Sequence, residues 1–593
     1  MPETRAAEGA GQASGLDRRA FMSRLSSFGL AATVFPDALW ALAEEKGKVT
    51  KEVIAQAEQV AGLAFTEPQR EMMVKGLNSL EEDFTKIRAV PLPNSVPPAL
   101  RFVPLLPGAR PPEGADAFAL SPQTAPAVGD DLEELAFLPA TTLGVLIAEH
   151  KVTSTALTKM YLARLKRYDP ILHCVITYTE ERALAQAAKA DEEIAAGHSR
   201  GPLHGVPWGV KDLFAVKGYR TTWGAGPYRD QVIDEDAAVV QRLDAAGAVL
   251  VAKLSCGALA MGDVWFGGKT RNPWDPEEGS SGSSAGSAAA TAAGLVGFAI
   301  GTETLGSIVS PSNRCGCTGL RPTFGRVPRT GAMALSWSMD KVGPIARSVE
   351  DCAAVFAAIQ GPDGQDGTVV AAPFRWDPGL DVRTLKVGYV KSLFAEKSEE
   401  DPDAEKKVQD KEWPVFDRAV LEVLRGAGVE LVPVELPDLP ADAMALLLSC
   451  EAAAAFDHLT RSGRDALLTA QGEDDWPNIF RQAQLIPAVE YIQANRARTL
   501  LMEAMAKLMG TVDAYLCPSF GGQDLTITNL TGHPCVVVPD GFRSNGTPTS
   551  ISFIGKLYGE GELLALARAY QEATTWHLRR PTLREKAKAK SKE

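Results

Sequence analysis

Apolar runs of strand length alternate with helical segments along the middle of the chain, and this alternation most constrains the fold. The runs Val206–Val210, Val249–Lys253 and Gly297–Ile300 predict strands, and residues 236–246 and 284–294 predict helices between them. Such alternation is typical of an α/β core with a parallel or mixed sheet. The pattern resumes with strands near 387–391, 429–434, 513–516 and 535–539, and with helices at 414–427 and across 440–510.

Two segments of a different character precede this core. Within residues 44–90, apolar side chains recur at helical spacing, as at Val53, Ile54, Ala57 and Val60, and predict a helical hairpin. Residues 91–126 hold ten prolines. Proline lacks a backbone N–H, so residues 91–130 are expected to be an extended linker or an arm wrapped on the core. The core spans 131–578, and residues 579–593 form a basic tail whose simplest interpretation is a solvated terminus.

The first residues predict an export signal. Residues 17–22 read DRRAFM, and the Arg18–Arg19 pair matches the twin-arginine pattern. A weakly apolar run follows, and Ala41–Ala43 offers a cleavage site before two glutamates. The run is far shorter than the ~20 residues that span a bilayer. We expect residues 1–43 to be a twin-arginine signal peptide and the protein to be periplasmic. If the segment is instead an ordinary amphipathic helix, the protein is cytoplasmic.

Charge and cysteine content exclude several classes of protein. The net charge is −13, whereas a generic nucleic-acid binder is basic. Eight cysteines without a C-x-x-C pair are too few for a disulfide scaffold and lack the spacing of a common zinc site. We therefore expect no metal, no cofactor, no nucleic-acid partner and no stable membrane insertion, and a homo-oligomer remains open.

The Gly/Ser-rich segment at residues 279–310 carries the strongest chemical signal. It is not a flexible linker, because its glycines run directly into an Ala-rich helix and a strand. It is not a phosphate-binding loop, because no Gly-Lys-Ser/Thr follows. Residues 282–286 match the G-x-S-x-G turn of α/β-hydrolases, which would make Ser284 the nucleophile. That class needs a downstream histidine, and the sequence places none of the three candidates beside Ser284: His458, His533 and His577.

Three motifs together resemble the amidase signature family. They are GVPWGVKDLF at 205–214, the Gly/Ser run, and GTETLGSI at 301–308, which is followed by CGCTGLRPTFGRVPRTGAM at 315–333. The resemblance spans about residues 135–575. It implies a large mixed, twisted sheet covered by helices on both faces. Residue by residue, it implies Lys211 as the catalytic lysine, Ser283 as a bridging serine after a cis peptide bond, and Ser307 as the nucleophile.

These residue types suit amide hydrolysis. Serine is a weak nucleophile without a base. Lysine serves as that base only when burial lowers its pKa from about 10.4 towards 7–8, a change of roughly 3–4 kcal/mol. In the family picture Lys211 accepts a proton from Ser283, Ser283 accepts one from Ser307, and Ser307 forms the acyl-enzyme. Backbone N–H groups are expected to form the oxyanion hole, at Thr304, Leu305, Gly306 and Ser307.

Four positions differ from the usual sequence of the family's motifs. Leu305 and Ala285 replace glycines, Glu303 replaces an aspartate, and Val309 replaces an arginine. Leu305 and Val309 bear on the substrate more than on the mechanism, and loss of the arginine disfavours anionic acyl groups. Asp212 is expected to be a structural acceptor. His204 and His533 are assigned no role.

The resulting prediction is an exported hydrolase that cleaves the C–N bond of a small-molecule amide and releases an acid and an amine or ammonia. Residues 51–99 are also similar to the small C subunit of the tRNA-dependent amidotransferase. One alternative is therefore a glutamine-hydrolysing A-type subunit of such a complex. Another, prompted by Leu305, is a binding protein without activity. Glu451, Phe456, Trp476 and Phe480 either line a substrate pocket or pack within the fold.

Overall fold

The computed structural model describes residues 49–61, 66–68, 70–71, 74, 94, 101–395, 412–484 and 486–583. The predicted signal peptide, most of the predicted hairpin and the end of the basic tail lie outside these residues. Within the hairpin region, helix α4 (Lys51–Ala61) buries Val53, Ile54 and Ala57. Val60, predicted on the same face, lies in the last turn of α4 and is 43% exposed.

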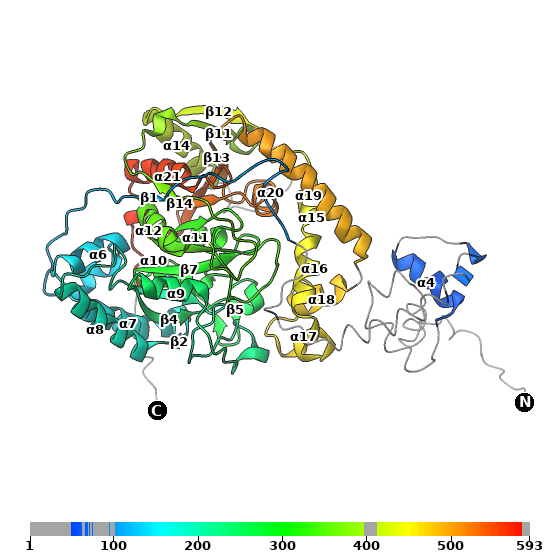
Figure 1. Cartoon of the computed structure of the whole chain (residues 1–593), viewed down its shortest axis with the longest axis horizontal. Helices are drawn as coiled ribbons and strands as arrows, with labels where there is room; N and C mark the ends of the chain where they lie inside the picture. Colours follow the sequence, from blue (N-terminus) through cyan, green and yellow to red (C-terminus); the bar gives the residue numbers. More distant parts are fainter. Residues whose placement is uncertain are drawn as a thin grey trace, which may run out of the picture.

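An 11-stranded mixed sheet forms the centre of the molecule (Figure 1). Its order is β12-β11-β13-β15-β14-β8-β9-β7-β3-β4-β2. Parallel pairing joins β12, β11 and β13 at one end and β7, β3 and β4 near the other, and the remaining pairs are antiparallel. The strands are β2 (Val175–Tyr178), β3 (Pro207–Lys211), β4 (Val249–Leu254), β7 (Phe298–Glu303), β8 (Thr318–Arg321), β9 (Lys341–Ala346), β11 (Lys386–Val390), β12 (Glu430–Val434), β13 (Ala514–Pro518), β14 (Cys535–Phe542) and β15 (Pro548–Gly555).

Helices cover both faces of this sheet, as predicted. Alternate residues of a strand point to opposite faces, and in β7 Phe298 and Ile300 join one apolar cluster whereas Ala299 joins another. The first face is packed by α6 (Ala140–Ala148), α9 (Ala238–Ala245), α12 (Val349–Ile359), α14 (Trp413–Gly426) and α21 (Glu560–Ala573). The opposite face is packed by α8 (Glu180–Ala195), α10 (Ala285–Ala292), α11 (Val309–Cys315), α15 (Ala441–Met444), α19 (Ala488–Met509) and α20 (Asp524–Thr531). Helix α7 (Ser154–Leu172) contributes to both.

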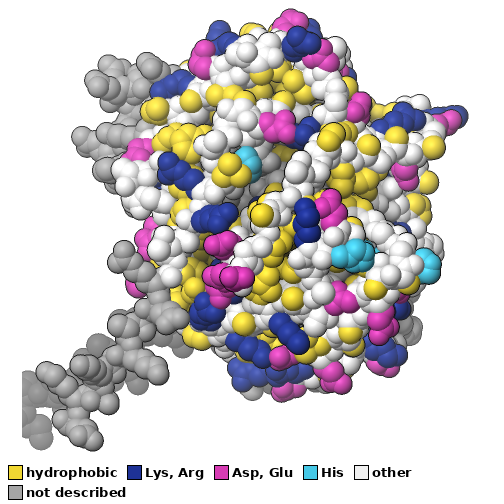
Figure 2. All heavy atoms as spheres, turned by 90° about the vertical axis from the view of Figure 1, so that its left-hand side faces the viewer, with side chains coloured by type: hydrophobic (Ala, Val, Ile, Leu, Met, Phe, Trp, Pro, Cys, Tyr) yellow, Lys and Arg dark blue, Asp and Glu magenta, His cyan; other side chains and the backbone are white. Residues whose placement is uncertain are grey.

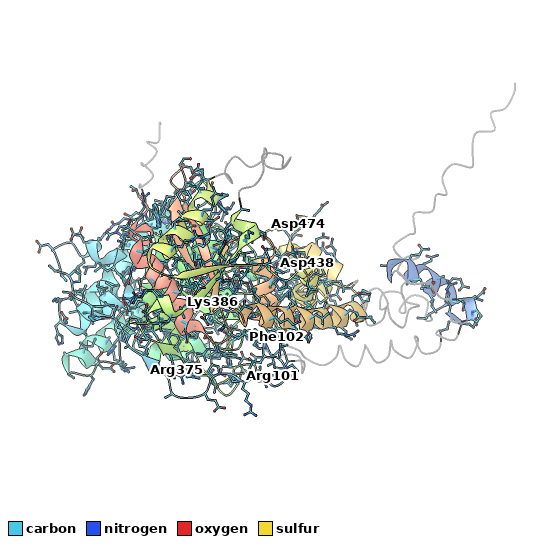
Figure 3. The ribbon with its side chains drawn as sticks, turned by 90° about the horizontal axis from the view of Figure 1, so that it is seen from above. Arg101, Phe102, Arg375, Lys386, Asp438 and Asp474 are labelled. Atoms are coloured by element: carbon cyan, nitrogen blue, oxygen red, sulfur yellow. The ribbon has the colours of Figure 1, made fainter. Side chains whose placement is uncertain are left out.

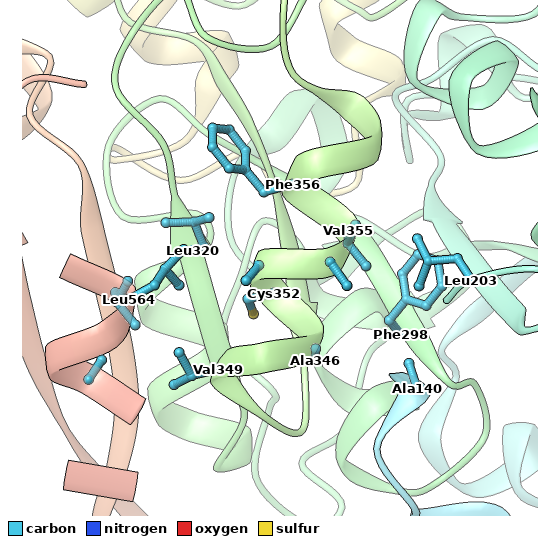
Figure 4. Packing of buried hydrophobic residues seen from close by; sticks show 14 of the residues in the cluster. Ala140, Leu203, Phe298, Leu320, Ala346, Val349, Cys352, Val355, Phe356 and Leu564 are labelled. Atoms are coloured by element: carbon cyan, nitrogen blue, oxygen red, sulfur yellow. The ribbon is translucent and has the colours of Figure 1, made fainter. Parts of the chain in front are cut away.

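The packing of α12 illustrates the first face. Cys352, Val355 and Phe356 are fully buried, and Figure 4 shows them between Leu320 of β8 and Phe298 of β7. These contacts close the sheet against solvent on the side away from the Gly/Ser-rich segment, so the chemistry predicted for that segment belongs to the other face.

Every strand predicted from an apolar run is present, but four strands of the 11-stranded sheet were not predicted. Two of them, β8 and β9, carry glycine or proline, which are depleted in strands. Gly343 in β9 has a structural reason, since a Cβ there would lie 2.0 Å from the carbonyl oxygen of Leu320 on β8. Of the others, β2 contains one threonine and β15 contains a threonine and two serines among their apolar residues, which weakens the periodic signal.

The described part of the Pro-rich segment, Asn94 and residues 101–126, contacts the core and contains one short strand, β1 (Ala117–Phe118), paired in parallel with β10 (Arg375–Trp376). The Ser121 backbone N–H and hydroxyl donate to the Glu350 carboxylate at 2.6 and 2.5 Å. We refer to residues 91–130 as the arm.

Basic and acidic side chains are interspersed over the face shown in Figure 2. Among the described residues, no helix is both long enough and apolar enough to cross a membrane. Smaller helices complete the fold beside α19: α16 (Leu446–Ala455), α17 (Asp457–Arg461) and α18 (Trp476–Ala483), with α13 (Lys391–Phe394) after β11 and the β5–β6 pair (Val264–Trp265, Gly268–Lys269) near the Gly/Ser-rich segment.

Candidate active site

Lys211 ends strand β3 with its side chain completely buried. Its Nζ lies 2.8 Å from Ser283 Oγ, 2.8 Å from Thr302 Oγ1 and 3.1 Å from Ser284 Oγ. Across the described residues, no carboxylate forms an ion pair with this amine. Burial lowers the pKa of Lys211 to about 7, although Cys256, Asp340 and Glu303 nearby act to raise it. The amine therefore sits among hydroxyl groups and is half neutral near pH 7.

Ser283 lies where the Gly/Ser-rich turn meets α10, and its side chain is buried. The peptide bond between Gly282 and Ser283 is cis, as the family resemblance implies. Glycine is required before this bond, because a Cβ at residue 282 would lie 1.8 Å from the carbonyl oxygen of Gly262. This close approach of two chain segments places Ser283 beside the lysine amine.

Ser307 lies in the turn between β7 and α11, and it is 8% exposed. The Ser284 N–H donates to the Ser307 carbonyl at 3.2 Å, which brings the turn that carries Ser307 against the Ser283–Ser284 pair. Gly306 has a φ of +87°, a left-handed conformation that favours glycine. Within the described part of the chain, the backbone N–H groups of Leu305, Gly306 and Ser307 donate to no other protein atom. These N–H groups remain available to a bound oxygen.

Glu303 holds this turn in place. One carboxylate oxygen accepts the backbone N–H groups of Ile308 and Val309 at 2.8 and 2.9 Å, at the start of α11. The other accepts from Arg321 at 2.7 Å and from Asn529 at 2.9 Å. Burial alone would raise the pKa of Glu303, but Arg321 and the hydrogen bonds lower it to about 2. The charged carboxylate thus fixes the residues that directly follow Ser307.

Thr304, also predicted in the oxyanion turn, is tied down by its side chain. Its hydroxyl donates to Asp340 Oδ1 at 2.5 Å. Asp340 Oδ2 accepts the N–H groups of Leu335 and Ser336 at 2.8 and 3.0 Å. The turn is therefore connected to the loop at residues 334–340.

Asp212 is a structural acceptor in this geometry. Its carboxylate forms a buried ion pair with Lys253 at 2.8 Å and accepts the N–H and hydroxyl of Thr222 at 2.8 and 2.5 Å. Lys253 also donates to the Arg220 carbonyl and the Thr221 hydroxyl. Two buried lysines therefore lie on adjacent strands, one paired with a carboxylate and the other surrounded by hydroxyls.

The rival assignment of Ser284 as nucleophile finds no histidine partner. Ser284 is buried, and its hydroxyl donates to the Thr302 carbonyl at 3.1 Å and lies next to Lys211. Of the three candidate histidines, His533 is buried against the Thr531 hydroxyl, and none contacts Ser284 among the described residues.

The four residues of the 440–510 region for which the sequence allowed either a pocket or a packing role have packing roles in the structure. Phe456, Trp476 and Phe480 stack in one buried cluster. Glu451 accepts hydrogen bonds from Ser336, Ser338 and Tyr491.

Thr302, Asp340, Arg321 and Asn529 were missed by the sequence interpretation, although Thr302 lies inside the GTETLGSI motif. Arg321 also lies inside a motif segment, residues 315–333, whereas Asp340 and Asn529 lie outside the motifs and meet the turn only in the fold. Among the described residues, no group of three or more His, Cys, Asp or Glu is arranged to hold a metal ion. All eight cysteines are free, and all except Cys450 are buried.

Several known proteins are similar to this chain in sequence and in fold. The model of the family described as Amidase matches residues 156–531. The A subunit of glutamyl-tRNA(Gln) amidotransferase from Geobacter metallireducens is 35% identical over 473 residues, covering 72% of this chain and 95% of the relative. The peptide amidase of Stenotrophomonas maltophilia is 31% identical with a TM-score of 0.64, covering 75% of this chain and 98% of that structure. An amidase family protein of Bacillus anthracis is 26% identical with a TM-score of 0.66, covering 76% of this chain and 93% of that structure.

Proposed function

Because the chain belongs to the amidase family and is an amide-hydrolysing enzyme, we propose that it cleaves a carboxylic amide through an acyl-enzyme on Ser307. Lys211 is the base, Ser283 is the bridge, and the products are an acid and an amine or ammonia. The observation that carries the proposal is the buried Lys211 amine, 2.8 Å from Ser283 and without a carboxylate partner among the described residues.

Burial favours a neutral Lys211 amine, and the surrounding hydroxyl groups can accommodate it, just as they could accept the three hydrogens of an ammonium group. A neutral amine has two hydrogens and one lone pair. The Ser284 hydroxyl donates its hydrogen to the Thr302 carbonyl, so the Ser284 oxygen accepts one hydrogen from the Lys211 amine. Thr302 Oγ1 accepts the other. The lone pair is then free for the Ser283 proton.

The reaction follows from this arrangement. Ser283 passes its proton to Lys211 and takes the proton of Ser307, whose oxygen attacks the amide carbonyl. The free N–H groups of Leu305, Gly306 and Ser307 stabilise the oxyanion, and loss of one such donor typically costs about 3–4 kcal/mol of transition-state stabilisation. The relay then runs in reverse, protonates the leaving nitrogen, and water releases the acid.

The acyl group is proposed to be uncharged. Val309 is buried in an apolar cluster with Met339, and Leu525 packs at the edge of that cluster. Leu525 lies close to Gly306: a Cβ atom added at residue 306 would be 3.0 Å from Leu525 Cδ2. An anionic acyl group would lose its hydration beside these residues without gaining a cation.

The test is labelling with a fluorophosphonate and a screen of amides against the purified protein. Ser307→Ala is expected to abolish both labelling and hydrolysis. Ser284→Ala is the matched control, because that serine is adjacent to the same amine but is not the proposed nucleophile. Retained labelling in Ser307→Ala, or loss only in Ser284→Ala and His533→Ala, would transfer the reaction to the other serine.

A second candidate is an A-type subunit of a tRNA-dependent amidotransferase, which the 35% identity to such subunits favours. It predicts glutamine hydrolysis that increases when partner subunits and tRNA are added. A broad amidase predicts activity on other amides by the chain alone.

We also propose export by the twin-arginine route, on the basis of residues 17–22. A reporter protein fused behind residues 1–43 should reach the periplasm, and the Arg18→Lys, Arg19→Lys double substitution should retain it in the cytoplasm. Equal transport of both fusions would reject the signal.

A further inference from the structure

The arm contacts the loop that holds the nucleophile turn. Asn94 Oδ1 accepts the Ala334 N–H at 2.7 Å, and Asn94 Nδ2 donates to the Ala334 carbonyl at 2.9 Å. An amide side chain that pairs with both backbone groups of one residue fixes the position of that residue. Ala334 begins the loop at residues 334–340.

The second contact runs through Arg498 of α19. The Arg498 guanidinium lies 3.5 Å from the centre of the Phe102 ring, and that ring meets the edge of Phe324 at 5.0 Å. Figure 3 labels Phe102 where the described arm passes beneath the helices around α19. The guanidinium is buried and donates to the hydroxyl and carbonyl of Ser338, both at 2.9 Å, and to the Leu530 carbonyl at 2.5 Å.

Both partners of Arg498 lead to the nucleophile turn. Ser338 lies in the loop that ends at Asp340, and Asp340 accepts the Thr304 hydroxyl. Leu530 follows Asn529, whose side chain donates to Glu303. Asp340 also acts on the base, because its charge raises the pKa of Lys211.

We propose that Asn94 and Phe102 of the arm are positioning residues for amide hydrolysis. They hold loop 334–340 and Arg498 so that Asp340 keeps Thr304 in place and maintains its field at Lys211. The Phe102 ring covers one face of the Arg498 guanidinium, and the N–H groups at the edge of that guanidinium donate hydrogen bonds to Ser338 and Leu530. The ring therefore fixes the position of the guanidinium. This inference rests on the proposed function, because it concerns the same Ser307.

The experiment measures the rate of Ser307 labelling by a fluorophosphonate as a function of pH in the full chain. Phe102→Leu keeps an apolar side chain but removes the ring face, and Asn94→Ala removes the other contact. Each is expected to lower the labelling rate at pH 8 about tenfold. The acidic limb of the profile should also move to lower pH, because Lys211 loses part of the field from Asp340. A purely structural role for the arm would not move that limb.

Two variants serve as controls. Phe102→Trp retains an aromatic face and should label within about twofold of the wild-type rate. Ser121→Ala weakens the attachment of the arm to Glu350, remote from the loop, and should leave both rate and limb unchanged. Wild-type rates and an unmoved limb in Phe102→Leu and Asn94→Ala would overturn the positioning role while the proposed function stands. A wild-type chain that does not label at all would overturn the proposed function, and the positioning role with it.

Discussion

Replacement of Lys211 by methionine should make the folded protein more stable while it removes the activity. The folded state holds the amine at a pKa of about 7 instead of the usual 10.5. Each unit of difference corresponds to 1.36 kcal/mol, so keeping this lysine buried costs about 5 kcal/mol at pH 7. Methionine has a similar shape and no charge. The substitution removes the hydrogen bonds from the lysine amine to hydroxyls such as those of Ser283 and Thr302, and each lost hydrogen bond costs about 1 kcal/mol. The expected net gain is about 2–4 kcal/mol.

The pH dependence gives this prediction its sign. Because the pKa is lower in the folded state, the unfolded chain binds the extra proton between pH 7 and pH 10.5. The wild-type protein therefore gains stability from this group as the pH rises through that window, and the gain is absent below pH 7. The advantage of Lys211→Met should be largest below pH 7, nearly as large at pH 7, and smaller than at pH 7 by about 3 kcal/mol at pH 9.5. Urea unfolding at both pH values measures it.

Lys253→Met is the matched control, since Lys253 is equally buried on the adjacent strand but pairs with Asp212 at 2.8 Å. Its removal leaves a buried carboxylate unpaired and should destabilise the fold by about 3–5 kcal/mol. The two substitutions thus have opposite signs. If Lys211→Met destabilised the protein at pH 7 as Lys253→Met does, the Lys211 amine would be charged in the fold and the proposed base would be lost.

Three further predictions concern groups around the same sheet. Below pH 7 the kcat/KM of the wild type should fall tenfold per pH unit as Lys211 takes up a proton, and a profile that stays flat to pH 5 would contradict this. Glu303→Gln should lower kcat and destabilise the fold by about 3–5 kcal/mol, because it leaves buried Arg321 unpaired. The pKa of Glu303 is lowered to about 2, so the ionised carboxylate stabilises the folded protein above pH 4.5, and this stabilisation is lost as the pH falls to 2. The urea unfolding midpoint of Glu303→Gln should therefore not show this decrease at acidic pH. Burial raises the pKa of both Asp417 and Asp540, and the charge of Asp540 raises that of Asp417 further, so the proton bound by this pair stabilises the fold in acid and is lost at alkaline pH. The wild-type unfolding midpoint should decrease between pH 6 and pH 9.5, and Asp417→Asn should make this decrease smaller. An equal decrease in the variant would mean that other groups cause the loss of stability at alkaline pH.

The alternation of strands and helices was sufficient to predict the α/β core, and the resemblance to the amidase signature family supplied Lys211 and its neighbour Ser283, whereas Thr302, which also contacts Lys211, was not predicted. Strand β3 ends on the lysine, and the Gly/Ser-rich run and the GTETLGSI motif surround one helix and one strand. The supports of the turn were not predictable in this way. Asn529 reaches Glu303 from a helix 226 residues further along the chain, and Arg321, although only 18 residues away, reaches it from strand β8, which was not predicted. Single polar residues carry no periodic signal that would identify them.

The unpredicted strands show the same limit. The residues of β8 and β9 are buried throughout, so they lack the alternation of apolar and polar residues that marks a half-exposed strand. Gly343 and Pro344 suggest a turn when considered alone. Only the approach of β9 to Leu320 explains the glycine. The aromatic residues of the 440–510 region were open to two interpretations for a related reason, since the sequence cannot distinguish a wall of a pocket from a packed core.

The position of Asn529 in the chain has a consequence for biosynthesis. A ribosome has made Lys211, Ser283 and Ser307 when little more than half of the protein has emerged. The neighbour of β8 in the sheet is β14, and the amide that completes the Glu303 carboxylate comes from α20, both from the last 70 residues. The nascent enzyme should therefore stay inert until α20 has been synthesised, and products truncated before residue 524 should carry Lys211, Ser283 and Ser307 without catalysing the reaction.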